Sequence, residues 1–184
     1  EVIRYFWSNG SGSPGLAKMP FSAWLIPEEK HSGQLQELIN RLSQENNSSE
    51  FPPHCSLLTQ IQNFSAIPIE KIEFFCSHTK TVRLNILNIM GGDTLFKSLY
   101  IQFIRDDSIL EFQQIFSNLF KNREPYRFDP HLSLMYKIVS AEKQKRIISE
   151  ISLPDHINFD CISIVNTGEI IEGWEIVHNQ KLSE

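Results

Sequence analysis

Two short segments of the sequence repeat one pattern of imidazole and hydroxyl side chains. Residues 53–58 read PHCSLL and residues 130–135 read PHLSLM, so that His54 and Ser56 correspond to His131 and Ser133. A single His-x-Ser triplet is weak evidence, because a chain with six histidines and many hydroxyl residues could contain one by chance. Two triplets that share a proline and a leucine at the same offsets are a much stronger signal, and they indicate an internal duplication.

The spacing within each triplet predicts how its side chains lie. Residues two apart on a β-strand point to the same face, so each segment would present one imidazole and one hydroxyl together. If the two halves pack about a pseudo-twofold axis, all four side chains face one groove. A neutral imidazole could then take a proton from water while an imidazolium protonates a leaving oxygen. The serine hydroxyls could donate to phosphate oxygens, so the pattern predicts phosphoester hydrolysis without a metal.

The hydrophobic pattern predicts the elements that must position these groups. Apolar residues at helical spacing indicate three helices. The first carries Leu35 to Leu42, the second follows a capping box formed by Ser108 and Glu111, and the third begins near Ser140. Strands are expected at 21–26, 54–59, 82–90, 99–104, 131–136, 159–165 and 174–177. Because strands and helices are mixed without strict alternation, we expect an α+β fold of antiparallel sheets flanked by helices.

Length and composition limit the organisation of the chain. With 184 residues it can build one substantial core, so we expect a single two-lobed domain over residues 19–184. Residues 1–18 end in a Gly- and Ser-rich segment, which is typical of an artificial leader or a disordered arm. The alternative is that Tyr5, Phe6 and Trp7 pack against the domain.

Charge and cysteine usage exclude several classes of protein. The net charge of -5 argues against a protein that clamps long nucleic acid, although a nucleotide-sized anion remains suitable. Cys55, Cys76 and Cys161 match neither a secreted disulfide scaffold nor a zinc site, which favours a reducing, cytoplasmic setting. No run approaches the roughly 20 apolar residues that cross a bilayer. We therefore expect a cytoplasmic monomer with no cofactor and no membrane partner.

With these motifs the sequence resembles the 2H phosphoesterase superfamily, and within it the cyclic phosphodiesterases. The likeness rests on the paired motifs, the opening segment FSAW at 21–24, the segment DPHLSLMY at 129–136, and residues 167–177 with Trp174. It implies a two-lobed fold and hydrolysis of nucleotide 2′,3′-cyclic phosphates, including ADP-ribose 1″,2″-cyclic phosphate, to 2′-phosphate products. An RNA end is a further substrate that the resemblance allows. Ser56 stands where the family often has threonine, which keeps the hydroxyl.

The resemblance also implies individual roles. It makes His131 the base that activates water and His54 the acid, and it places Tyr136 beside the phosphate. Strand alternation by itself would turn Tyr136 away from Ser133, unless the chain bends after Met135. Trp24 is either a platform for the base or an ordinary core aromatic.

Two other functions fit the same residues. One is an enzyme of the same kind with another substrate, such as a 2′-5′ oligonucleotide or cyclic dinucleotide phosphodiesterase or an RNA 2′-5′ ligase. The other is a nucleotide-binding module without catalysis.

Overall fold

The computed structural model describes residues 21–62, 64–121, 126–168 and 170–183, so the expected leader at 1–18 lies outside the described residues. The strands pair antiparallel in one sheet of order β1-β2-β5-β4-β3-β6-β7. They are β1 (Phe21–Pro27), β2 (Cys55–Ile61), β3 (Val82–Gly91), β4 (Leu99–Phe103), β5 (His131–Met135), β6 (His156–Asn166) and β7 (Glu175–Lys181).

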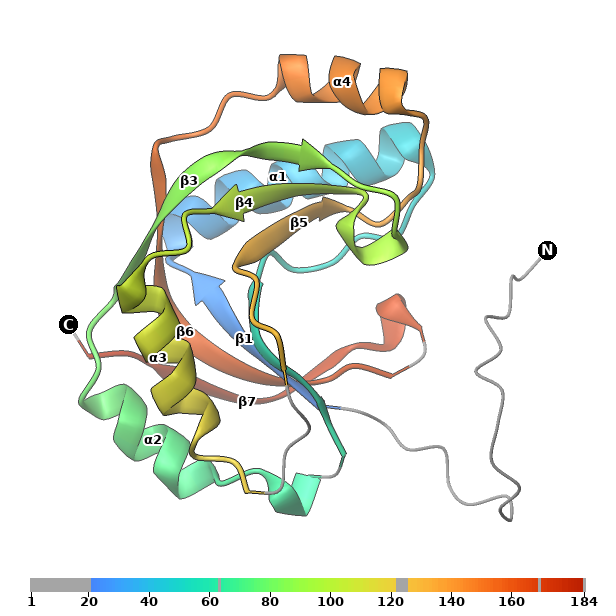
Figure 1. The fold of residues 1–184 in the computed structure, drawn as a ribbon. Helices are drawn as coiled ribbons and strands as arrows, with labels where there is room; N and C mark the ends of the chain where they lie inside the picture. Colours follow the sequence, from blue (N-terminus) through green and yellow to red (C-terminus); the bar gives the residue numbers. More distant parts are fainter. Residues whose placement is uncertain (1–20, 63, 122–125, 169, 184) are drawn as a thin grey trace, which may run out of the picture.

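The sheet closes on itself, because β1 pairs with β6 as well as with β2. β6 belongs to both halves of the molecule: residues 156–159 pair with β3 and residues 161–166 pair with β7, while β1 runs along the opposite edge. In Figure 1 strands β3, β4 and β5 form the upper half, and β1, β6 and β7 form the lower half. This arrangement confirms the expected α+β fold in two lobes.

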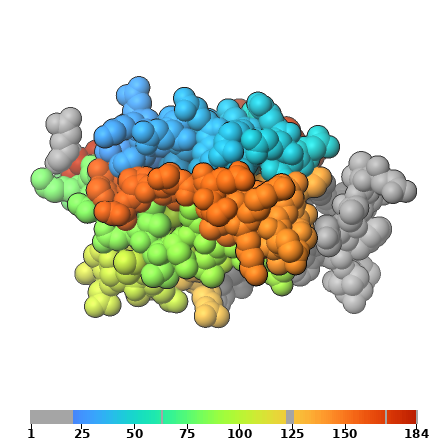
Figure 2. Space-filling view, turned by 90° about the horizontal axis from the view of Figure 1, so that it is seen from above, coloured from blue at the N-terminus to red at the C-terminus, as the bar shows by residue number. Residues whose placement is uncertain are grey.

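Four helices cover the described sheet: α1 (Glu29–Asn46), α2 (Ile69–Ser77), α3 (Asp107–Ser117) and α4 (Ala141–Glu150). α1 packs on β1 and β5, and α4 packs on β3. Figure 2 shows α1 and the segment around α4 side by side on the face seen from above. α2 and α3 lie together at the other end, where the Phe75 ring meets those of Phe112 and Phe116 edge-on.

The first helix forms as its sequence predicts. Leu35, Ile39 and Leu42 are buried along one side of α1, at the spacing that a helix places on one face. The helix ends at Asn47, which adopts the left-handed conformation with φ of 52° that asparagine tolerates better than most residues. The fourth helix also begins as expected, because the Ser140 side chain accepts a hydrogen bond from the Lys143 N–H.

Two sequence expectations about helices were wrong. The N-cap of α3 is Asp106, whose carboxylate accepts from the Ile109 N–H, and the Ser108 hydroxyl donates to the same carboxylate. The proposed capping box of Ser108 and Glu111 therefore begins two residues too late. Residues 69–77, for which the pattern predicted no element, form α2. This helix is short and follows Pro68 without a side-chain cap, so its start is marked by little more than the acidic Glu70 in the first turn.

The connection between β3 and β4 matters for the site. It turns at Gly91-Gly92-Asp93 and then forms a short 3₁₀-helix, η2 (Leu95–Lys97). A Cβ on Gly92 would lie about 2.2 Å from the Lys97 carbonyl oxygen, so only glycine lets the two segments approach this closely. Glycine at this turn places η2 against β5.

Candidate active site

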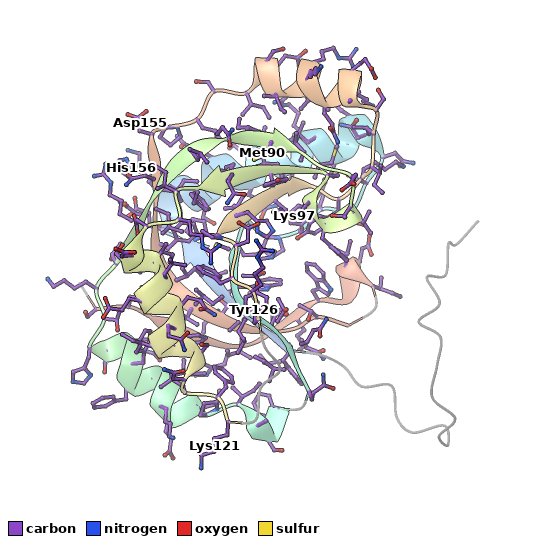
Figure 3. All side chains as sticks on the ribbon, viewed as in Figure 1. Met90, Lys97, Lys121, Tyr126, Asp155 and His156 are labelled. Carbon is purple, nitrogen blue, oxygen red and sulfur yellow. The ribbon has the colours of Figure 1, made fainter. Side chains whose placement is uncertain are left out.

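Both His-x-Ser motifs line one pocket of about 420 Å³ between the two halves of the sheet. Its lining is Ser22, Trp24, His54, Ser56, Thr59, Gln60, Phe96, Lys97, Tyr126, His131, Ser133, Tyr136, Thr167, Gly168 and Trp174. In Figure 3 Lys97 and Tyr126 lie in the middle of the view, between the upper and the lower strands. A larger cavity of about 750 Å³ lies between α1 and residues 150–157, but neither motif lines it.

The strand register explains why four polar side chains reach one pocket. β2 and β5 meet through a single residue pair, Cys55 with Leu132, and both of these side chains are fully buried in the core. Their neighbours along each strand must therefore point to the other face. Because the strands are antiparallel, this register brings His54 toward Ser133 and Ser56 toward His131.

The two imidazoles are held in the same way. Nδ1 of His54 lies 2.7 Å from the Pro52 carbonyl oxygen, and Nδ1 of His131 lies 2.7 Å from the Asp129 carbonyl oxygen. A carbonyl can only accept, so each Nδ1 carries the hydrogen. Each Nε2 is then the ring nitrogen left to exchange protons with a bound molecule, as an acceptor when the ring is neutral and as a donor when it is charged.

The surroundings keep both rings neutral in the free protein. Burial lowers the pKa of His54 to about 4; the hydrogen bond to Pro52 opposes this shift, and the nearby His131 adds to it. Burial also lowers the pKa of His131. The indole of Trp24 covers one face of His54, with ring centroids 3.6 Å apart and planes 12° apart, and so contributes to that burial. A bound anion is the natural means of restoring a proton to one ring.

The two serines are unequal although their motifs match. Ser133 is buried, and its hydroxyl donates to the Phe96 carbonyl oxygen at 2.7 Å. Ser56 is half-buried, and its hydroxyl has no hydrogen-bond partner within the described ranges. Ser56 can therefore donate to a ligand directly, whereas Ser133 would first have to give up its bond to the main chain.

Tyr136 faces the pocket, contrary to simple strand alternation. β5 ends at Met135, so the alternation does not extend to the next residue. The ring of Tyr136 stacks on Phe51 with centroids 3.7 Å apart and meets Phe96 edge-on. The bend considered from the sequence is the correct alternative, and Tyr136 closes the pocket on the side of the second motif.

Trp24 lies in the core and also lines the pocket. It is 1% exposed, one face is covered by His54, and Trp174 meets it edge-on at 5.4 Å. This packing supports a role in seating His54 more than a role as a platform for a base. Trp174 and Phe96 face each other across the pocket with nearly parallel rings 6.4 Å apart.

Sequence reasoning missed several pocket residues. Lys97 and Phe96 enter from η2, and Gln60 adopts a left-handed conformation with φ of 58° at the end of β2. Nothing in the sequence near these residues repeats between the halves. Their place depends on how the β3–β4 connection folds back, which no local pattern encodes.

The described residues lack two kinds of feature. They contain no group of three or more His, Cys, Asp or Glu side chains placed to hold a metal ion. Nor do they include a helix that is long and apolar enough to span a membrane. The three cysteines are free and buried.

Comparison with known proteins places this chain in a family. The family model described as cyclic phosphodiesterase-like protein matches residues 19–182. A cyclic phosphodiesterase of Arabidopsis thaliana is 21% identical over 130 residues, which cover 71% of this chain and 72% of the relative.

Solved structures share the fold. The Thermus thermophilus protein TT0787 has a TM-score of 0.58 at 12% identity, covering 89% of this chain and 98% of that one. LigT of E. coli, solved in complex with 3′-AMP, has a TM-score of 0.55 at 10% identity, covering 90% and 99%. Because the family model spans nearly the whole chain, the chain belongs to the cyclic phosphodiesterase-like proteins of the 2H phosphoesterase superfamily.

Proposed function

We propose that the protein hydrolyses nucleotide 2′,3′-cyclic phosphates, including ADP-ribose 1″,2″-cyclic phosphate. In a 2′,3′-cyclic nucleotide it opens the cyclic phosphate ring and leaves a 2′-phosphate. His54 and His131 transfer the protons, and no metal ion takes part. The observation that carries this proposal is the matched seating of the two imidazoles, each bound through Nδ1 to the carbonyl two residues earlier. Each Nε2 is thereby left to act on a phosphate in the same pocket.

The chemistry needs one neutral ring and one charged ring. The neutral imidazole removes a proton from water, the water oxygen bonds to phosphorus, and the bond from phosphorus to the 3′ oxygen breaks. The charged imidazole gives its proton to that departing oxygen. The proton count balances, because one ring gains a proton as the other loses one. The Ser56 hydroxyl donates to a non-bridging oxygen, on which charge builds in the transition state.

A bound substrate supplies the negative charge that favours protonation of one imidazole. The cyclic phosphate is an anion, and an anion near an imidazole raises its pKa. With pKa values lowered by burial in the free protein, the pocket binds the substrate together with one proton. The phosphate thereby prepares the acid that its own hydrolysis requires.

The two rings can divide the work in two ways. The family resemblance makes His131 the base and His54 the acid. In the free protein the low pKa of His54 favours the reverse, because the ring that holds a proton less readily is the better candidate for the base. We adopt the assignment from the resemblance, and the leaving-group experiment in the Discussion distinguishes the two.

Relatives support a nucleotide-sized substrate. LigT of E. coli has been solved in complex with 3′-AMP, with phosphate and with NADP+. The pocket of this chain has a volume of about 420 Å³ and aromatic walls formed by Phe96, Tyr136 and Trp174, which suits one nucleotide. Tyr136 and the remaining wall would enclose the ribose and base.

A turnover screen tests the proposal. Purified protein is incubated with 2′,3′-cyclic AMP, 3′,5′-cyclic AMP, ADP-ribose 1″,2″-cyclic phosphate and 2′-5′ oligoadenylate, and products are followed by phosphorus NMR. We expect turnover of the first and third substrates, with the 2′-phosphate as the product of 2′,3′-cyclic AMP. Turnover of the oligoadenylate alone would replace the proposed substrate, and tight binding of 2′,3′-cyclic AMP without turnover would make the protein a binding module.

A further inference from the structure

An ion pair stands at the end of the pocket that holds the second motif. The Lys97 ammonium lies 2.6 Å from Oδ2 of Asp129, with the two side chains 30% and 46% exposed. The same ammonium lies 4.3 Å from the centre of the Tyr100 ring, a cation–π contact. The pair joins η2, which reaches the pocket from the β3–β4 connection, to the residue two before His131.

Asp129 connects this pair to the imidazole. Its carbonyl oxygen accepts the Nδ1 hydrogen of His131 at 2.7 Å, and Oδ1 of its carboxylate accepts from Gln102 at 3.0 Å. Gln102 also donates to the Pro130 carbonyl at 2.9 Å. The main chain that orients the His131 ring is therefore fixed from two sides, by η2 and by β4.

The first motif has a different residue at this position. Its imidazole is bound to the carbonyl of Pro52, which has no side-chain group that can pair with a cation. The ring of His54 is instead seated against the indole of Trp24. The two motifs are alike in main-chain geometry and unlike in charge, since a carboxylate and an ammonium flank only His131 among the described lining residues.

We propose that Lys97 and Asp129 are a positioning pair that orients His131 and sets the charge around it, so that the two histidines of the duplicated motif do different work. This inference rests on the proposed hydrolysis and adds to it two residues outside both motifs. Neither residue is required to contact the substrate.

Charges around His131 make the pair testable. Burial raises the pKa of Asp129, but hydrogen bonds from Lys97 and Gln102 outweigh it, so the carboxylate is ionised at neutral pH. Burial lowers the pKa of His131, the hydrogen bond to Asp129 raises it, and the charges of Lys97 and Asp129 then lower and raise it respectively. The other titratable groups facing this ring are His54, which directly precedes β2, Tyr100 from β4, and Tyr126 and Tyr136. Burial raises the pKa of Tyr126 and that of Tyr136.

The single variants should therefore shift the His131 pKa in opposite directions. Lys97→Met leaves the carboxylate unopposed and raises that pKa, whereas Asp129→Asn leaves the ammonium unopposed and lowers it. NMR titration of the His131 imidazole in the free protein measures both shifts and requires no turnover. Lys97→Arg should leave the His131 pKa close to its wild-type value, because arginine keeps the positive charge and can pair with Asp129.

Kinetics provides a second readout. In kcat/KM against pH for 2′,3′-cyclic AMP, the limb that belongs to His131 should move in the direction of each NMR shift. Loss of orientation should also lower kcat by up to about 10²-fold in Asp129→Asn. Lys145→Met, on the exposed side of α4, is the matched control and should change neither measurement.

Some outcomes would overturn the inference, and another would overturn only the proposed hydrolysis. Shifts of one sign in both variants, or no shift in either, would show that the pair is only structural. A rise in KM for Lys97→Met with an unmoved titration would make Lys97 a substrate contact instead. If the NMR shifts appear but wild-type protein hydrolyses none of the cyclic phosphates, the pair stands and the proposed hydrolysis fails.

Discussion

Each histidine is held by two kinds of contact that act on different properties. The hydrogen bond from Nδ1 to a main-chain carbonyl fixes the tautomer and the plane of the ring, while burial decides how readily the ring is charged. For His54 the second contact is the Trp24 indole. A change in Trp24 would therefore alter the protonation of His54 without touching its hydrogen bond.

Removing either imidazole should stop efficient turnover. We expect His54→Ala and His131→Ala each to lower kcat about 10²- to 10⁴-fold, which is the usual contribution of a positioned acid or base. A substrate with a better leaving group needs less help from the acid, so with it the variant that lacks the acid regains much of its rate. If the resemblance holds, that variant is His54→Ala. If His131→Ala regains its rate instead, the two roles are reversed. Near-normal rates in both alanine variants would contradict the two-histidine mechanism.

Burial of His54 should also make stability depend on pH. Its pKa is about 4 in the folded protein and near 6.5 when unfolded, so the unfolded chain binds more protons between these values. Stability contributed by this group is present above about pH 6.5 and is lost as the pH falls, by up to about 3 kcal/mol. Urea unfolding at pH 7 and pH 5 measures the part of this loss that falls above pH 5, about 2 kcal/mol. His54→Gln should show a smaller loss over the same range, and an equal loss would contradict the assignment.

At the scale of the elements, the 3₁₀-helix η2 contributes several contacts to the site although it is only one turn long. It brings Lys97 to Asp129 and offers the Phe96 carbonyl to Ser133. Its position depends on Gly92, at which a Cβ would meet the Lys97 carbonyl at about 2.2 Å. The backbone rather than a flexible side chain is the obstacle, so η2 itself has to move.

Gly92→Ala should therefore impair activity as well as folding. We expect a loss of about 1–3 kcal/mol in unfolding free energy, typical of overpacking, and a lower kcat/KM at temperatures where the variant is fully folded. Asp106→Ala is the control, because loss of the α3 N-cap should cost about 1 kcal/mol and leave kcat/KM unchanged. Equal kcat/KM in folded Gly92→Ala and in wild type would show that catalysis does not depend on the position of η2.

Local pattern predicted those parts of the structure that depend on neighbouring residues in the chain. The period-two spacing in PHCSLL and PHLSLM predicted that each histidine lies with its serine, and the repeat of the motif suggested that the two pairs share one groove; all four residues line one pocket. Helix α2 was missed because it has no cap, and the orientation of Tyr136 was uncertain because it depends on where β5 ends. The ion pair of Lys97 and Asp129 joins residues 32 apart, and such a pairing is decided by tertiary folding.

At the scale of the whole molecule, we expect activity to survive complete chelation. Throughout the described ranges no cluster of side chains suits a divalent ion, and two imidazoles can supply both proton transfers. Rates for 2′,3′-cyclic AMP should be equal in EDTA and in magnesium buffer. Loss of turnover in EDTA that is restored by adding a divalent ion would require a metal in the mechanism.

The closed sheet has one narrow seam, the single pair of Cys55 with Leu132 that joins β2 to β5. The histidines flank this seam, while Thr59 and Gln60 line the pocket farther along β2. If the lobes move apart, the seam acts as a pivot: the outer rim widens while the spacing of the two imidazoles changes little. We therefore expect distance measurements between probes placed at Gln60 and on η2 to broaden in the free protein and narrow with 3′-AMP. Probes on Ser56 and Gln102, near the pivot, should report one distance in both states.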